Sequence, residues 1–264
     1  MSADDFWAGD PARRARWEQL MAWLAPRPGE RILDVGCGAG AAIAFVAGQV
    51  GPRGRAIGLD RFPDSLARLG ASDLSAGPSL RGVAGDGQDL PFADNCFDAL
   101  LCVNVLEAMT DRPRALAEMN RVLKPGGRIL VAHDDYESQA YAGADRELTR
   151  RAVLAYASAT FQSYPTSDGQ MGRHLWGLFA RAGFVDAEVR VLPLINTEYC
   201  EPLQGWVLSQ FAAPFVAAVS DLTQAEIDRW HRELTAASER GDYFYCLNLY
   251  VCYGRKPAAD GPGG

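Results

Sequence analysis

The sequence reads ILDVGCGAG over Ile32–Gly40, a short and mostly apolar run followed by three alternating glycines. The apolar run predicts a buried strand, and the apolar segment that follows, Ala41–Val50, predicts a helix. Glycines between a strand and a helix let the backbone turn sharply and approach a ligand closely. We therefore expect a nucleotide-type binding loop here, and the alternative is a glycine-rich turn that holds no ligand.

Two kinds of nucleotide compete for this loop. Gly36, Gly38 and Ala41 match the G-x-G-x-x-A pattern of dinucleotide sites, which favours NAD. Asp34, however, lies two positions before the first glycine, where a pyrophosphate would meet a fixed negative charge. A ligand that carries a sulfonium or an ammonium and no phosphate would be attracted instead. S-adenosylmethionine has that charge pattern, so Asp34 favours it as the cofactor.

Strand and helix patterns alternate outward from the loop. Further strands are predicted at Arg55–Asp60, Leu80–Ala84, Phe97–Val103, Arg128–Ala132, Val185–Ile195 and Phe244–Tyr253, with Arg31–Val35 as the first. Alternation of this kind predicts an α/β fold with right-handed crossovers and a parallel sheet. Pro193 confines its strand to an edge or a bulge. The last segment is apolar on both faces, so we expect it to be a central strand.

Two acids downstream of the loop are candidate nucleoside ligands. Asp60 ends the second strand, where a carboxylate can accept hydrogen bonds from both ribose hydroxyls, although NAD sites share this feature. Asp86 follows the third strand and could take the adenine amino group, with the backbone of Gly87 beside the ring. The alternatives are a surface acid at a strand end for Asp60 and a solvated turn for Asp86.

Four ordered motifs resemble those of the class I S-adenosylmethionine-dependent methyltransferases. ILDVGCGAG resembles the family's first motif, GLD its ribose-binding acid and GDGQDLPF its adenine-binding turn. NVLEAMTDRPRALAEMNRVLKPGGRILV resembles the segment from the fourth strand through the fifth. The resemblance covers about residues 30–133. It implies a Rossmann-like sheet of seven mostly parallel strands, in which an antiparallel last strand is inserted between the fifth and the sixth and helices cover both faces.

The resemblance also assigns roles to single residues. It implies that the glycines Gly36, Gly38 and Gly40 approach the methionine moiety and that Asp34 helps to hold its amino group. By the same likeness, Asp60 binds the ribose, and Asp86 and Gly87 lie at the adenine. Asn104 would line the methionine end, and Arg61 would pack over the adenine. One departure is Ala108, which stands where many members that methylate small molecules carry a histidine.

Composition excludes several other classes of protein. The 264 residues carry a formal net charge of −7 and no Lys/Arg-rich run, which argues against a nucleic acid partner. The longest apolar stretches are too short to span a bilayer, and the acidic start MSADDFWAGD does not fit a signal peptide. The six cysteines form no Cys-x-x-Cys pair, so a cytoplasmic location with free thiols is the expectation.

His133 and Asp134 are the candidate catalytic residues. They close the predicted fifth strand, and ligands of open parallel sheets bind at the carboxyl ends of the strands. We expect His133 to act as a base, with Asp134 as its orienter or as an alternative base. A structural histidine or a helix cap is the competing interpretation. No metal is expected, because three adjacent residues in His-Asp-Asp cannot all face one ion.

The segments outside the sheet predict a helical cap on a single domain that spans residues 1–264. The cap segments are about 1–25, 136–171 and 196–240, and they are rich in aromatic residues. These are Phe6, Trp7, Trp17, Tyr136, Tyr141, Tyr156, Phe161, Tyr164, Tyr199, Trp206, Phe211 and Phe215. They favour an apolar pocket for a small hydrophobic acceptor. Residues 196–240 either fold over this pocket or dock against a second subunit in a homodimer.

The expected activity is transfer of the sulfonium methyl to oxygen, nitrogen or nucleophilic carbon of an aromatic acceptor. The cap resembles those of members that modify quinones and natural products, and an indole or a polyketide-like phenol would suit an aromatic pocket. An NAD-dependent oxidoreductase is one alternative, which Asp34 opposes. A binding module without catalytic activity is the other.

Overall fold

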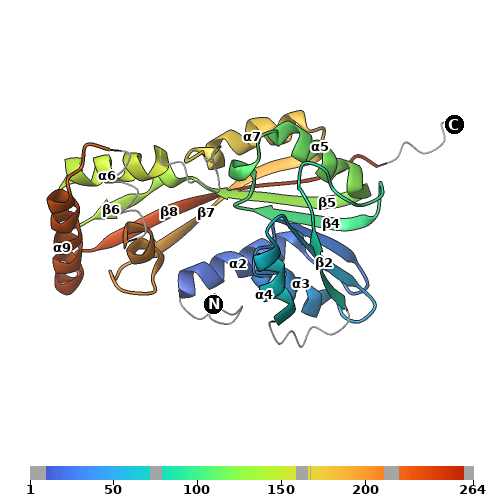
Figure 1. The fold of residues 1–264 in the computed structure, drawn as a ribbon, viewed down its shortest axis with the longest axis horizontal. Helices are drawn as coiled ribbons and strands as arrows, with labels where there is room; N and C mark the ends of the chain where they lie inside the picture. The colour runs from blue at the N-terminus through green and yellow to red at the C-terminus, as the bar shows by residue number, and fades with distance from the viewer. Residues whose placement is uncertain (1–9, 72–78, 159–165, 167, 211–219, 259–264) are drawn as a thin grey trace.

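The computed structural model describes residues 10–71, 79–158, 166, 168–210 and 220–258. Its centre is an eight-stranded sheet with helices on both faces (Figure 1). The strands are β1 (Arg31–Val35), β2 (Arg55–Asp60), β3 (Leu80–Ala84), β4 (Phe97–Val103), β5 (Leu123–Asp134), β6 (Ala140–Ala142), β7 (Val185–Asn196) and β8 (Phe244–Arg255). The helices are α2 (Pro11–Leu24), α3 (Ala41–Val50), α4 (Pro63–Ala71), α5 (Arg112–Val122), α6 (Arg146–Ser158), α7 (Met171–Arg181) and α9 (Gln224–Arg240).

The order of the strands confirms the predicted topology. β3, β2, β1, β4 and β5 are parallel neighbours, and β8 lies antiparallel between β5 and β7. β7 contains Pro193 and pairs with β8, which agrees with the expected edge strand. The three-residue strand β6 was not expected from the sequence. It pairs with the start of β8, beyond the end of β5.

Successive side chains of each strand point to opposite faces of the sheet, so the apolar side chains are divided between two cores. Leu33 and Val35 of β1 face one side, where they pack in a cluster with residues of α5 and α7. Ile32 faces the other side, in a cluster with residues of α2 and α3. The sheet is therefore buried on both faces, as a parallel sheet requires. A binding site can then form at the loops that follow the carboxyl ends of the strands.

Helix ends follow the local sequence. Asp111, which caps the start of α5, accepts a hydrogen bond from the Arg114 backbone N–H at 3.0 Å. Thr223 and Glu226 form a capping box at the start of α9, and Gly241 ends this helix in a left-handed conformation. These contacts satisfy the free backbone groups at the helix ends.

The cap lies at the end of the sheet where β7 and β8 extend past β5, and it builds a third core there (Figure 1). Trp230 of α9 donates a hydrogen bond from Nε1 to Thr149 of α6, and it packs against Tyr141 of β6. Tyr156, Tyr199 and Trp206 belong to the same region. The described part of 196–240 thus packs on its own chain.

Some expectations fall on residues outside the described ranges. Phe6, Trp7, Phe161, Tyr164, Phe211 and Phe215 lie there, as do residues 211–219 of the predicted cap segment 196–240. Within that segment, residues 204–210 are helical. In the described ranges, no helix has both the length and the apolar character that a membrane crossing needs. All six cysteines are free.

Candidate active site

The glycine loop leaves β1 and is anchored to β2. The backbone N–H groups of Gly36 and Cys37 both donate to the Leu59 carbonyl, at 2.7 and 3.0 Å. Gly36 and Gly38 have φ of +77° and +52°, a left-handed conformation that side chains with a Cβ rarely adopt. A Cβ on Gly36 would also overlap Val105, whereas one on Gly38 would enter open space. The loop therefore combines a tight turn with an open concave surface.

Asp60 holds this loop in place. Its carboxylate accepts hydrogen bonds from the backbone N–H groups of Gly38 and Phe62, both at 2.9 Å. Asp34 lies behind the loop and is 3% exposed. Burial, together with the negative charge of Asp60, raises the pKa of Asp34 to about 7. Asp60 thus places negative charge under the glycines, and Asp34 adds a second negative charge as the pH rises past about 7.

A cavity of about 330 Å³ opens in front of the loop, at the carboxyl ends of β1, β2 and β4. Seven of the predicted cofactor residues line it, namely Gly36, Gly38, Asp60, Arg61, Asp86, Gly87 and Asn104. The lining residues that the structure describes do not include Asp34, Gly40, His133 or Asp134. Tyr136 from the cap and Glu107 complete one wall of the cavity.

Asp134 is committed to structural contacts. Its carboxylate forms an ion pair with Arg16 of α2 at 2.8 Å and accepts a hydrogen bond from the Asn104 side chain at 2.9 Å. The Asn104 side-chain oxygen in turn accepts the Asp134 backbone N–H at 2.8 Å. These contacts join α2 and the end of β4 to the end of β5.

The predicted pairing of His133 with the Asp134 carboxylate does not occur in the structure. β5 continues through Asp134 because β8 pairs with it as far as Leu249. Successive side chains of a strand point to opposite faces, so the two residues diverge. His133 Nδ1 instead lies 2.8 Å from the Asp134 backbone carbonyl, and its ring is 1% exposed.

Glu107 was not identified from the sequence as a site residue. It lies in η2 (Leu106–Ala108), a short 3₁₀ helix that follows β4, and its Oε2 is 3.9 Å from His133 Nε2. Burial, together with the charges of Asp134 and Asp168, raises the pKa of Glu107 to about 7. Glu107 lies in the stretch NVLEAMT, which resembles the family's segment after the fourth strand. Nothing in the sequence of this turn indicated that its side chain would be buried.

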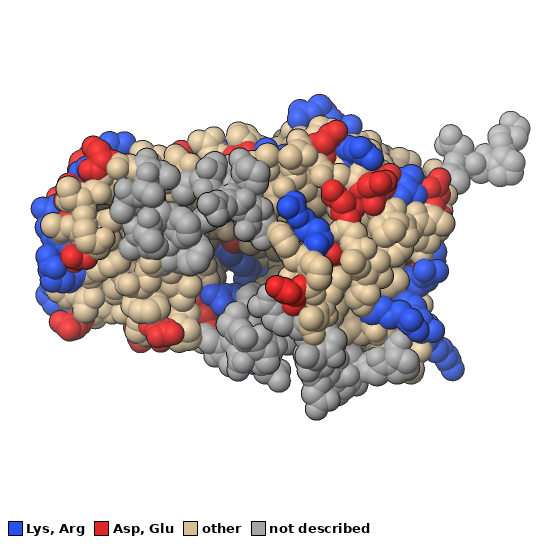
Figure 2. All heavy atoms as spheres, viewed as in Figure 1, with Lys and Arg blue, Asp and Glu red and all other residues tan. Residues whose placement is uncertain are grey.

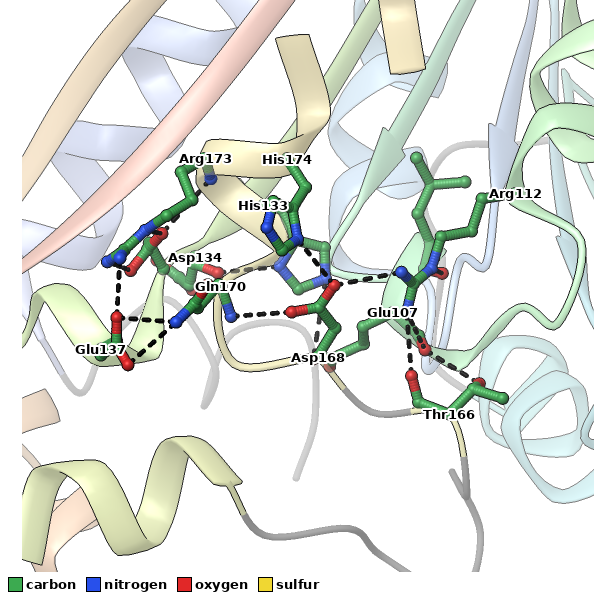
Figure 3. Close-up of polar contacts among 12 residues, drawn as sticks. Glu107, Arg112, His133, Asp134, Glu137, Thr166, Asp168, Gln170, Arg173 and His174 are labelled. Carbon is green, nitrogen blue, oxygen red and sulfur yellow. Dashed lines mark hydrogen bonds and ion pairs between the residues drawn. The ribbon is translucent and has the colours of Figure 1, made fainter. Parts of the chain in front are cut away.

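A network of charged side chains supports this turn from the cap side (Figure 3). Arg112 forms an ion pair with Asp168 at 3.0 Å, and it donates to the backbone carbonyls of Glu107 and Thr166 at 3.4 and 2.9 Å. Asp168 also bonds His174 at 3.0 Å. Nearby, Arg173 pairs with Asp135 and Glu137. Among the described residues no cluster has the composition of a metal site.

The residues present fit S-adenosylmethionine. The open space at Gly38 admits a ligand against the backbone, and Asp60 and Asp86 line the same cavity. Acidic groups at the glycine loop suit a ligand with a positive charge and no phosphate. Hydrogen-bond acceptors at the ends of β2 and β3 suit the hydroxyl and amino groups of adenosine.

Comparison with known proteins agrees with this geometry. A family model described as a methyltransferase domain matches residues 33–131. A 2-phytyl-1,4-naphthoquinone methyltransferase of Synechococcus elongatus is 32% identical over 198 residues, which cover 69% of this chain and 85% of that protein. A demethylmenaquinone methyltransferase of Symbiobacterium thermophilum is 31% identical over 206 residues, which cover 68% and 79%.

The fold has counterparts among solved structures. A phosphoethanolamine N-methyltransferase 2 of Haemonchus contortus, in complex with S-adenosylhomocysteine, superposes with a TM-score of 0.55 at 16% identity, covering 91% of this chain and 53% of that one. The chain belongs to the class I S-adenosylmethionine-dependent methyltransferases. Its cofactor is S-adenosylmethionine, which decides against the oxidoreductase, and the related methyltransferases decide against the non-catalytic module.

Proposed function

We propose that this methyltransferase acts on a small hydrophobic acceptor with an aromatic ring and a ring hydroxyl, of the hydroquinone class. The methylated atom is a ring carbon or the hydroxyl oxygen. The observation that carries the proposal is the aromatic ring of Tyr136 in the wall of the cavity, which Glu107 also lines. Tyr156 supports this ring by meeting it edge to face, with ring centroids 5.3 Å apart. A flat aromatic ring suits this surface.

The related quinone methyltransferases support the same class of acceptor. A quinone ring is poor in electrons, whereas its reduced hydroquinone form has nucleophilic ring carbons and acidic hydroxyls, so we place the reduced form in the site. On the face that Figure 2 shows, acidic and basic side chains are interspersed over the described residues. A nucleic acid partner would need a continuous basic surface.

The cofactor roles follow the position of each side chain. We propose that Asp60 accepts the ribose hydroxyls, that Asp86 and Gly87 bind the adenine, with Arg61 packing over it, and that Asn104 lines the methionine end. Gly36 and Gly38 would give the cofactor its close approach to the backbone, with Gly40 completing the turn. Asp34 would act electrostatically from behind the loop in its ionised form, since it lies outside the described lining.

When bound, S-adenosylmethionine supplies an activated methyl group for in-line displacement. The chain has to hold the acceptor atom about 3–3.5 Å from that methyl and to exclude water. Tyr136 would position the aromatic ring. We further propose that residues 1–264 form one domain and that it works in a reducing cytoplasm, which its six free cysteines support. Pairing into a homodimer is left as an alternative to a monomer.

The test is a transfer assay with three probes. Chemically reduced 2-phytyl-1,4-naphthoquinone, 1-naphthol and indole are each incubated with the protein and S-adenosylmethionine. Release of S-adenosylhomocysteine is measured, and the product is analysed by mass spectrometry. We expect the reduced naphthoquinone to react fastest. Preference for 1-naphthol or indole would replace the hydroquinone class with a phenolic or indole-like natural-product acceptor.

The aromatic wall is tested with the same assay. We expect Tyr136→Ala to raise the acceptor KM at least fivefold and Tyr136→Phe to leave it nearly unchanged, because the ring and not the hydroxyl makes the contact. Equal KM values for both variants and the wild type would remove Tyr136 from the acceptor site.

A further inference from the structure

Two buried polar atoms face each other behind the cavity wall. Oε2 of Glu107 and Nε2 of His133 are 3.9 Å apart, and neither has a hydrogen-bond partner among the described residues. Buried polar groups are nearly always paired, and the exceptions are often explained by function. The gap exceeds a hydrogen bond by about 1 Å, so a modest rotation of the Glu107 side chain brings the two atoms into contact.

The surroundings define which protons these groups carry. His133 Nδ1 lies 2.8 Å from the Asp134 carbonyl, which can only accept, so Nδ1 is the protonated nitrogen. Burial lowers the pKa of His133, which keeps the ring neutral. The lone pair of Nε2 therefore faces Glu107. A neutral imidazole in this position can accept a hydrogen bond from a protonated Glu107, but it has no proton to give it.

The backbone of Glu107 is held while its carboxylate stays uncommitted. The Glu107 carbonyl accepts hydrogen bonds from Arg112 at 3.4 Å and from the Thr166 hydroxyl at 3.0 Å (Figure 3). Arg112 also donates to the Leu106 carbonyl at 3.2 Å. The turn that presents the carboxylate to the cavity is therefore anchored on both sides, which is what a positioned acid or base needs.

Several other charged or titratable groups surround this pair. Asp134 and Asp168 disfavour the ionised form of Glu107, and Arg112 favours it. The phenols of Tyr136 and Tyr156 also lie within electrostatic range, and burial keeps both neutral by raising their pKa values. The result is a carboxyl that exchanges its proton near neutral pH, where a general base is most effective.

We propose that Glu107 is the catalytic base that takes the hydroxyl proton of the acceptor, and that His133 is a positioning residue that holds Glu107 from behind. This inference rests on the proposed hydroxyl-bearing aromatic acceptor. It revises the expectation that His133 meets the acceptor itself.

The acceptor O–H bond breaks and its proton moves to the Glu107 carboxylate. The electron pair left on the acceptor makes the oxygen or a ring carbon nucleophilic, and that atom forms the bond to the methyl carbon. The carbon–sulfur bond breaks and its electron pair stays on sulfur. When a ring carbon is methylated, the ring C–H proton replaces the one lost from the hydroxyl. One proton is released to water for each methyl transferred.

The first experiment compares Glu107→Gln with the wild type, using reduced 2-phytyl-1,4-naphthoquinone and 1-naphthol. We expect kcat to fall at least 100-fold, because a general base contributes about 10²–10⁴-fold. The acceptor KM and the affinity for S-adenosylmethionine, measured by calorimetry, should stay within about threefold. Glu147→Gln is the matched control, because it makes the same change on the exposed face of α6. A Glu107→Gln enzyme with kcat within threefold of the wild type would overturn the proposal.

The second experiment tests the role of His133 through the pH profile. His133→Asn keeps a donor for the Asp134 carbonyl and removes Nε2, which would otherwise stabilise the protonated Glu107. We expect the rise of kcat with pH, centred near 7 in the wild type, to move at least half a pH unit lower in this variant. A structural role would reduce kcat without moving the profile, and that result would overturn the positioning role.

The two proposals fail in different ways. A wild type that methylates 1-naphthol or indole but not the reduced naphthoquinone would overturn the hydroquinone class alone. If indole were the only substrate, the hydroxyl-proton step would also be overturned. An active wild type with an equally active Glu107→Gln variant would overturn the base alone. Inactivity of the wild type with all three probes would overturn both.

Discussion

The guanidinium of Arg16 lies 2.8 Å from the carboxylate of Asp134, and both side chains are buried, with 7% and 10% of their surface exposed. Arg16 also donates to the backbone carbonyls of Leu192 in β7 and Leu247 in β8. One side chain thus joins the helix that precedes the first strand to three strands of the sheet. The contact holds α2 beside the end of β5, where Asp134 in turn accepts a hydrogen bond from Asn104 of the cavity lining.

We expect Arg16→Met to lower the free energy of unfolding by about 3–5 kcal/mol, because it leaves Asp134 as an uncompensated buried charge. The double variant Arg16→Met/Asp134→Asn should recover part of this loss. Equilibrium unfolding in urea measures both. Arg14→Met is the control, since Arg14 forms an exposed pair with Glu18 worth at most about 0.5 kcal/mol. Equal losses for Arg14→Met and Arg16→Met would contradict the prediction.

Asp34 should make stability depend on pH. Its pKa of about 7 in the folded state lies above the unfolded value of about 3.9, so the folded state holds a proton that the unfolded state releases. Stability therefore falls as pH rises from about 4 to 7, and Asp34 alone accounts for about 3 kcal/mol between pH 5 and pH 8. Asp34→Asn should remove this contribution to the pH dependence. The measurement is the free energy of unfolding of the variant and of the wild type at pH 5 and at pH 8. Parallel pH dependences would show that Asp34 is ionised in the fold.

Gly38→Ala should separate backbone strain from cofactor binding. Its φ of +52° imposes a cost of about 1–2 kcal/mol on any residue with a Cβ. The added methyl would also stand in open space at the cavity wall, so we expect the affinity for S-adenosylmethionine to fall at least tenfold in calorimetric titration. Gly126→Ala imposes similar strain away from the cavity, with φ of +75° and open space around it. Equal cofactor affinity in the two variants would place the binding surface elsewhere.

Trp230→Ala should test whether cap and sheet unfold as one domain. Trp230 is 4% exposed and bonds Thr149, so its removal should cost about 3–5 kcal/mol. We expect a single thermal transition, monitored by circular dichroism, that moves as a whole to lower temperature. Trp176→Ala, on an exposed part of α7, should change it little. Two transitions of which only one moves would show that the cap is a separate unit.

The order of strands could be predicted because local periodicity and a resemblance pointed to the same topology. Gly36, Gly38, Asp60 and Asp86 were found because their positions follow from the strand ends that precede them. The length of β5 could not be predicted in this way, since its last residues become a strand only through pairing with β8. That pairing joins segments more than a hundred residues apart, and no local pattern in His133-Asp134 records it.

What the chain determines locally is the shape of the cofactor loop and the presence of an acid before it, because glycine conformation and residue type are properties of single residues. Burial beside Asp60, which only the fold supplies, sets the pH at which Asp34 becomes charged. What tertiary structure alone decided is which of His133, Asp134 and Glu107 lines the cavity. Strand alternation turned His133 and Asp134 away from each other, and packing brought Glu107 from a different turn into the space between His133 and the cavity. Proton-transfer groups are defined by distance and burial, and both depend on elements that meet only when the whole sheet has formed.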